Sequence, residues 1–328
     1  MKNFIKKAVI FVSIILLMPI SIELILLTKP NVYSYKRDYI ERHLNDISVL
    51  LMGNSHIEEA LIPNLMGDSV FNFAISGRSY TVDVELAERY IPTMENLSVV
   101  LMPLDYTDFS FGRLEHKDVV NPQKRARLNN TYKCMATKYL GVRQYGLIYW
   151  SEILNSDFNY IGRLAKNRNS RDFCDSLGYV SMDVNNRPKD WQEQRVPGKL
   201  ISNVTIDKEE YDDFVNGLEK ICQLSSKRGA RFILVSAPVY KTYQEAIEDV
   251  LLKDMQDFVD YLKSKYDNVD YYNFLFSQDF SDEDFYDAGH LTKSGAAKFT
   301  KMLRDSLFIH PVSDEIAINT ESFSVSHN

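Results

Sequence analysis

The chain has 328 residues, of which 45% are hydrophobic, so it can bury the core of one large domain or two small ones. Its formal net charge is −7, and no basic stripe with interleaved aromatic residues occurs. Attraction to the phosphate backbone drives nucleic-acid binding, so nucleic acid is excluded as an expected partner. The sequence also has no GxGxxG loop and no CxxC spacing, and we therefore expect no cofactor and no metal site.

The N-terminus begins with lysines and continues as an apolar run over residues 8–27, in which Glu23 is the one charged residue. About 20 apolar residues can cross a bilayer, although a charged start before an apolar run is also typical of a signal peptide. No small-x-small cleavage site follows, which favours an uncleaved anchor held in the lipid bilayer by residues 8–27. The signal-like arrangement favours a periplasmic or exterior body. Basic residues also follow the span, so a cytoplasmic-facing orientation stays open.

The rest of the chain alternates between short apolar runs and amphipathic segments. A Tyr-rich linker helix is expected over 31–46. Runs that suit strands buried on both faces occur at 47–53, 70–76, 97–104, 230–238 and 269–274. Helical spacing of apolar residues occurs at 81–91, 210–224, 246–266 and 294–308. This alternation predicts a three-layer α/β/α sandwich with a mainly parallel five-stranded sheet.

Residues 106–229 differ from this pattern and are rich in Tyr, Asn, Arg and Lys. We interpret most of the stretch as a largely helical insertion over the carboxyl edge of the sheet, where such folds bind ligands. The predicted organisation is an anchor over 1–30, one α/β domain over 31–310 and a flexible tail over 311–328. Two cysteines within the stretch, Cys134 and Cys174, are candidates for pairing in an oxidising compartment.

The stretch VLLMGNSHIEEAL, residues 49–61, places Ser55 where a strand ends and a helix begins. A hydroxyl at this point projects over the carboxyl edge of the sheet, and its backbone N–H lies in the first helical turn, where it favours a developing oxyanion. Serine is also a preferred N-cap, and Ser55 with Glu58 matches the capping box S-x-x-E. Taken alone, the stretch favours the N-cap.

A second stretch, DAGHLTKSGAAKF, places Asp287 and His290 three residues apart before the last predicted helix. A serine nucleophile needs a histidine to accept its proton and a carboxylate to orient that histidine. Both stretches follow strands of one parallel sheet, which changes the interpretation of Ser55 from N-cap to nucleophile. His56 is expected to face away from Ser55 as the helix begins, as a packing or surface residue.

GNS after the first strand and D-x-x-H before the last helix resemble the SGNH/GDSL-type hydrolase superfamily. This resemblance implies a flavodoxin-like SGNH fold, with Ser55 as nucleophile and Asp287 and His290 as the other triad members. It also implies that a glycine after the second strand, here Gly77 in NFAISGRS, donates an N–H to the oxyanion. The chain is most similar to divergent membrane-anchored members linked to cell-surface polysaccharide acylation.

Two positions depart from the family pattern. Asn54 replaces the usual first-block aspartate, which transfers no proton. The family's G-x-N-D block follows the third strand and its asparagine donates to the oxyanion, whereas MPLDYTD places Asp105 at about that position. A carboxylate accepts hydrogen bonds and repels an oxyanion, and loss of one such donor can cost about 100- to 1000-fold in rate.

The sequence therefore predicts a membrane-anchored serine esterase or O-acyltransferase that forms an acyl-enzyme. The expected substrate is a small ester or an acylated, above all acetylated, cell-surface or exported glycan, and a transferase would receive its acyl group from a membrane acyl-donor protein. Aromatic residues of the insertion either stack on sugar rings or form its core; they include Tyr145, Tyr149 and Trp150. The alternative is a catalytically silent SGNH-fold glycan-binding or scaffold protein, in which Asp105 marks a lost oxyanion site.

Overall fold

The structure is a computed structural model of the chain. It describes residues 2–28, 31–78, 80–106, 109, 131–132, 151–155, 174–193 and 208–308. The expected Cys134–Cys174 pair, the aromatic residues at 145, 149 and 150, and the tail over 311–328 therefore lie wholly or partly outside the described residues. The division of the chain into domains stays a prediction.

The described residues form one sheet of five parallel strands in the order β2-β1-β3-β4-β5. The strands are β1 (Val49–Leu51), β2 (Val70–Asn72), β3 (Val99–Pro103), β4 (Arg231–Ser236) and β5 (Val269–Asn273). This is the doubly wound order of flavodoxin-like folds, in which ligands bind beyond the carboxyl ends of the strands. The predicted fold class is confirmed, and all five strands lie within the apolar runs that predicted them.

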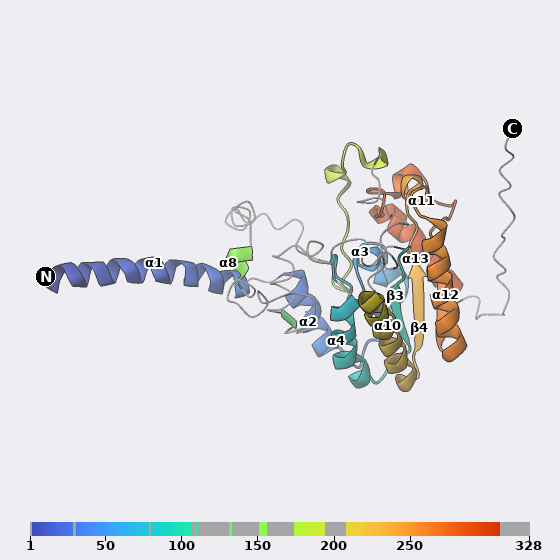
Figure 1. Cartoon of the computed structure of the whole chain (residues 1–328), viewed down its shortest axis with the longest axis horizontal. Helices are drawn as coiled ribbons and strands as arrows, with labels where there is room; N and C mark the ends of the chain where they lie inside the picture. Colours follow the sequence, from blue (N-terminus) through green and yellow to red (C-terminus); the bar gives the residue numbers. More distant parts are fainter. Residues whose placement is uncertain are drawn as a thin grey trace.

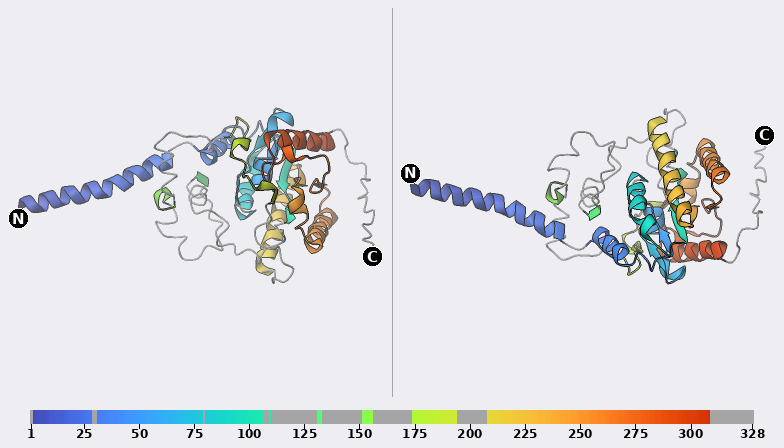
Figure 2. Two further views of the ribbon diagram at one scale, coloured as in Figure 1. Left: turned by 90° about the horizontal axis from the view of Figure 1, so that it is seen from above. Right: turned by 90° about the horizontal axis from the view of Figure 1, so that it is seen from below.

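Helices cover both faces of the sheet. On one face lie α2 (Val32–Arg42), α4 (Tyr80–Tyr90), α10 (Lys208–Arg228) and α12 (Asp249–Lys265), and on the other lie α3 (Ser55–Glu58) and α13 (Lys293–Phe308). Figure 2 shows α10 and α13 on opposite sides of the sheet. Successive strand residues supply the two cores: Leu50 packs with the first set of helices and Leu51 with the second. Both are fully buried, as expected for strands covered on both faces.

Short elements complete the described structure. They are η1 (Pro63–Leu65), η2 (Ile91–Thr93), α8 (Glu152–Asn155), η5 (Val184–Asn186), η6 (Trp191–Glu193), α11 (Lys241–Gln244) and η7 (Asp282–Asp284).

The N-terminal apolar run forms one long helix, α1 (Lys2–Thr28), which extends away from the α/β body in Figure 1. Within the described residues it is the one helix long and apolar enough to cross a membrane, with a mean hydropathy of 2.7 and 6% of its apolar window buried. A membrane anchor and a signal sequence both meet this description. Near its end, a Glu23 Oε2 atom accepts hydrogen bonds from Ser151 Oγ at 2.8 Å and from the Ile153 N–H at 3.1 Å, so α8 lies against α1.

The Tyr-rich segment that follows α1 is more than the linker helix expected from its polarity. Asn31 caps α2 by accepting from the Tyr33 and Ser34 N–H groups. Tyr33 and Ile40 belong to the main core, and Lys36 between them has no exposed surface. Helix α2 therefore packs as an integral part of the α/β body.

Two of the described parts of residues 106–229, residues 174–193 and α10, pack against the sheet or its helical layer. Residues 174–193 begin beside the β2 edge, where the Asn72 N–H donates to Leu177 O at 2.8 Å and the Val180 N–H donates to Glu58 O at 3.2 Å. This contact covers an otherwise open strand edge. The stretch ends in α10, which belongs to the helical layer and packs against the neighbouring helix α4 and against strand β4 of the sheet.

Candidate active site

The segment that leads into α3 is fixed by glycine and asparagine. Gly53 has a φ of 112°, and a Cβ atom there would lie 2.2 Å from the Pro103 ring, so only glycine fits where β1 ends beside β3. Asn54, not Ser55, is the N-cap of α3: its Oδ1 atom accepts from the His56 N–H at 2.9 Å. The capping box expected of Ser55 is absent, because the Glu58 side chain turns to Lys36 and to the Ser76 N–H. Ser55 is the first helical residue, so its hydroxyl is not occupied by capping.

The structure brings the three predicted triad residues together. His290 Nε2 lies 3.0 Å from Ser55 Oγ, and His290 Nδ1 lies 2.9 and 3.0 Å from the two Asp287 carboxylate oxygens. Asp287 Oδ1 also accepts from the Gly289 and His290 N–H groups at 2.9 and 2.8 Å. The carboxylate thus holds the imidazole through one ring nitrogen and leaves the other facing the serine hydroxyl.

The electrostatics of Asp287 suit this orienting role. Burial alone raises the pKa of its carboxyl, but the hydrogen bond and charge of His290 and the two backbone donors outweigh burial, so the pKa of Asp287 lies below its usual value of 3.8. Asp287 is therefore ionised at neutral pH and stabilises an imidazolium on His290. A second carboxylate, that of the buried Glu59, lies 3.9 Å from His290 Nε2.

Gly77 lies in a tight turn just beyond β2. The Arg78 N–H donates to Ile75 O at 3.0 Å, which closes the turn, and Gly77 has a φ of 73° at its third position. A positive φ at this position is typical of a type II turn and favours glycine. The Ser76 N–H is held by Glu58, and Arg78 Nη1 donates to Phe73 O at 2.8 Å. The turn is thus fastened on both sides of Gly77, whose role as an oxyanion donor stays a prediction.

Asp105, at the end of β3, is tied to the segment that contains Ser55. One carboxylate oxygen accepts from Asn54 Nδ2 at 3.0 Å, and the other lies 2.7 Å from His56 Nδ1. Burial raises the pKa of Asp105, but the charge and hydrogen bond of His56, the Asn54 amide and the charge of His290 lower it below the usual value. An ionised carboxylate therefore lies at this edge of the sheet with its two oxygens engaged.

His56 belongs to this site, contrary to the expectation that it faces away. Its ring lies edge to face with the His290 ring, with the centroids 5.4 Å apart, and its Nδ1 atom contacts Asp105. The expectation missed this position because it depends on Asp105, which follows β3 and is 49 positions away in the sequence. Two carboxylate–imidazole pairs, Asp287–His290 and Asp105–His56, therefore lie next to each other.

No family model matches the sequence, and no curated protein matches it. Among solved structures, a protein from Streptococcus pneumoniae named as a platelet activating factor is similar over 92% of this chain and 99% of its own, with 14% identity and a TM-score of 0.43. A GDSL-like lipase from Bacteroides thetaiotaomicron VPI-5482 is similar over 84% of this chain and 99% of its own, with 10% identity and a TM-score of 0.38.

The likeness to these two solved structures concerns the fold alone. Within the site, the predicted residues Ser55, Asp287 and His290 are in contact through His290.

Sequence reasoning missed Glu59 and the contacts that His56 makes at this site. Both belong to the quoted stretch VLLMGNSHIEEAL, but nothing in that stretch shows that Asp105 lies beside it, because the contact joins residues 49 positions apart.

Among the described residues, no group of three or more His, Cys, Asp or Glu side chains is arranged to hold a metal ion.

Proposed function

We propose that the protein is a serine hydrolase or acyltransferase that acts on carboxylic esters through an acyl-enzyme at Ser55. The observation that carries the proposal is the unbroken chain of contacts from Asp287 through His290 to Ser55 Oγ. A nucleophile within hydrogen-bond reach of a base that a third group orients is the geometry of nucleophilic acyl transfer.

The reaction follows from this geometry. His290 Nε2 takes the proton of Ser55 Oγ as the oxygen attacks the ester carbonyl, and Asp287 stabilises the imidazolium that forms. The Ser55 and Gly77 N–H groups stabilise the oxyanion. His290 then donates its proton to the leaving alkoxide, and the acyl group remains on Ser55. Water or a sugar hydroxyl, deprotonated by His290, finally takes the acyl group and frees the serine.

The contacts of Asp105 support activity despite the missing third-block asparagine. A carboxylate near an oxyanion is unfavourable when its charge is uncompensated, but both Asp105 oxygens are engaged by Asn54 and His56. Hydrogen bonds from these two partners spread the negative charge of the carboxylate. The pair therefore reduces the electrostatic penalty expected from Asp105.

The proposal extends to substrate and place. The apolar helix α1 anchors the protein in the bilayer, and the α/β body lies in the periplasm or outside the cell. There it removes or transfers acyl groups, above all acetyl, of a cell-surface or exported glycan, with a membrane acyl-donor protein as partner when it transfers. The support is the apolar span together with the family resemblance of the triad blocks.

A catalytically silent glycan-binding or scaffold protein is the second candidate. The observation that favours it is Asp105 itself, because the carboxylate stands where the family has an oxyanion donor. The two functions differ in whether Ser55 is reactive.

Covalent labelling of the full chain by a fluorophosphonate at neutral pH separates the two functions. We expect labelling of the wild type, none of Ser55→Ala, and labelling about 100-fold slower or more for His290→Ala, because the serine then lacks its base. Ser264→Ala is the matched control: it removes an exposed serine hydroxyl at the end of α12 and leaves labelling unchanged. A wild type that does not react, in a folded state, supports the silent protein instead.

A further inference from the structure

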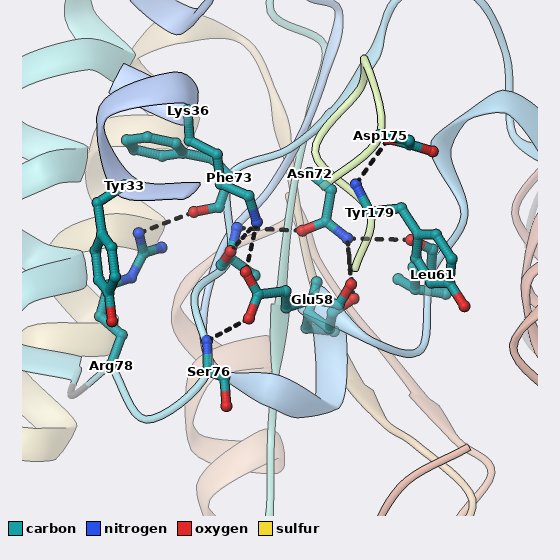
Figure 3. Close-up of polar contacts among 12 residues, drawn as sticks. Tyr33, Lys36, Glu58, Leu61, Asn72, Phe73, Ser76, Arg78, Asp175 and Tyr179 are labelled. Atoms are coloured by element: carbon teal, nitrogen blue, oxygen red, sulfur yellow. Dashed lines mark hydrogen bonds and ion pairs between the residues drawn. The ribbon is translucent and has the colours of Figure 1, made fainter. Parts of the chain in front are cut away.

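A buried carboxylate joins the helix that carries Ser55 to the turn that carries Gly77. Glu58, the last residue of α3, is 3% exposed. Its Oε2 atom accepts from the Ser76 N–H at 2.6 Å, while its Oε1 atom lies 2.8 Å from Lys36 Nζ. Figure 3 shows these contacts converging on the Glu58 side chain. The two proposed oxyanion donors therefore lie on segments that one side chain connects.

The counterion of Glu58 comes from the helix that follows the apolar span. Lys36, on α2, has no exposed surface and bonds both to Glu58 and to Ala74 O, at 2.5 Å. A lysine buried to this degree is rare unless it is paired, and an unpaired buried charge is strongly unfavourable. Lys36 thus holds the backbone on one side of the turn through Ala74 O, while Glu58 holds the other side through the Ser76 N–H.

A second buried carboxylate makes a parallel connection. Asp83, on α4, accepts from the Gly53 N–H, two residues before Ser55, and its Oδ1 atom lies 2.5 Å from Arg78 Nη2 at the end of the turn. Burial raises the pKa of Asp83, and both Asp83 and Arg78 are almost fully buried. These two side-chain connections add to a backbone hydrogen bond from the Ile75 N–H to Gly53 O at 2.9 Å, so the Gly77 turn is fastened to the Ser55 segment by more than the bond that closes a four-residue turn.

We propose that Lys36 and Glu58 are positioning residues that fix the Gly77 N–H relative to Ser55, so that α2 is part of the active-site scaffold. The inference rests on the proposed function, because a fixed oxyanion donor matters only if an oxyanion forms. Oxyanion donors act through preorganisation, and a donor displaced by a fraction of an ångström loses much of its effect. The alternative is that this ion pair contributes stability alone.

Two double variants of the full chain separate these roles. In Lys36→Met/Glu58→Gln the carbonyl of the introduced amide still accepts from the Ser76 N–H, and its NH₂ group can donate to Ala74 O, which Lys36 has vacated. In Lys36→Met/Glu58→Met both backbone groups lose their partners. The variants have the same charge and nearly the same volume, so they differ chiefly in the polar contacts of the turn.

The measurements are fluorophosphonate labelling, with the maximal rate and the half-saturating concentration determined separately, and the unfolding temperature of each variant. We expect the Met/Gln variant to stay within about threefold of the wild-type rate. The Met/Met variant should lose about 10- to 100-fold in maximal rate with little change in half-saturation, because a misplaced oxyanion donor weakens the transition state rather than binding. Equal rates for both variants, when both are folded, would overturn the positioning role.

Backbone amide exchange gives a readout that does not depend on activity. In the wild type and in the Met/Gln variant, the Ser76 N–H should exchange as slowly as core strand amides, because it is bonded to a buried acceptor. Fast exchange of this amide in the wild type overturns the inference whatever the labelling shows. An unreactive wild type with slow exchange contradicts the proposed function while supporting the fastened turn.

Discussion

At the scale of single residues, Asp287 controls both the orientation of His290 and part of the pH dependence of stability. Asp287→Asn keeps the shape of the side chain but removes the charge that stabilises the imidazolium, so we expect kcat to fall by about 1000- to 10,000-fold. The pKa of Asp287 is lowered in the folded state, so its contribution to stability is present above about pH 4 and is lost as the pH falls through the folded value. The unfolding temperatures of the wild type and Asp287→Asn should therefore converge below pH 4. A difference between the two temperatures that grows below pH 4 would contradict the lowered pKa of Asp287.

The Asp105–His56 pair makes a second residue-scale prediction. His56→Ala removes a donor from a buried, ionised carboxylate and should lower the free energy of unfolding by about 2–3 kcal/mol. In Asp105→Asn the charge is gone, so adding His56→Ala to it should cost much less. A double-mutant cycle by denaturant unfolding measures this coupling, and additive effects would show that the contact contributes nothing.

At the scale of elements, the positions of the strands and of most helices follow from the sequence, because apolar runs and helical spacing reflect burial on two faces or one. The triad is predictable for a related reason: parallel strands all end at one edge, so the residues that follow β1 and β5 meet there. The character of α2 was missed. Its buried face includes Lys36. A lysine in a sequence predicts an exposed position, and the sequence does not show that Lys36 is paired with the buried Glu58. The N-cap interpretation of Ser55, which the sequence analysis replaced by that of a nucleophile, falls to Asn54 in the structure, because asparagine caps equally well.

The junction of β1 and α3 yields an element-scale prediction with an internal control. In Gly53→Ala the backbone keeps an unfavourable positive φ and the added Cβ atom collides with the Pro103 ring. Gly229 also has a positive φ, of 77°, but a Cβ atom added there meets open space among the described residues. Gly229→Ala should therefore cost about 1–2 kcal/mol in the free energy of unfolding, and Gly53→Ala should cost more. Denaturant unfolding of the two variants measures the difference; equal costs would show that the approach of Pro103 is not limiting.

At the scale of the whole molecule, α1 and α2 differ in how much they contribute to the core of the α/β body. Helix α1 is almost entirely exposed in the described structure, whereas α2 supplies Tyr33, Lys36 and Ile40 to the body. A chain that starts at residue 30 should fold and react like the full chain, although it lacks the apolar helix α1. A chain that starts at residue 45 leaves Glu58 buried without its cation and should be unfolded or unreactive. Circular dichroism and probe labelling of both chains test this, and a fully reactive shorter chain would contradict it.

The most direct test of the central claim is to trap the acyl-enzyme. The full chain is mixed with an activated acetyl ester, quenched in acid within the first turnover and mapped by peptide mass spectrometry. The proposed mechanism predicts one acetyl group on Ser55, absent from Ser55→Ala and strongly reduced in His290→Ala. Rapid ester turnover with no acetyl group on Ser55, or an acetyl group that persists at another residue in Ser55→Ala, would contradict it.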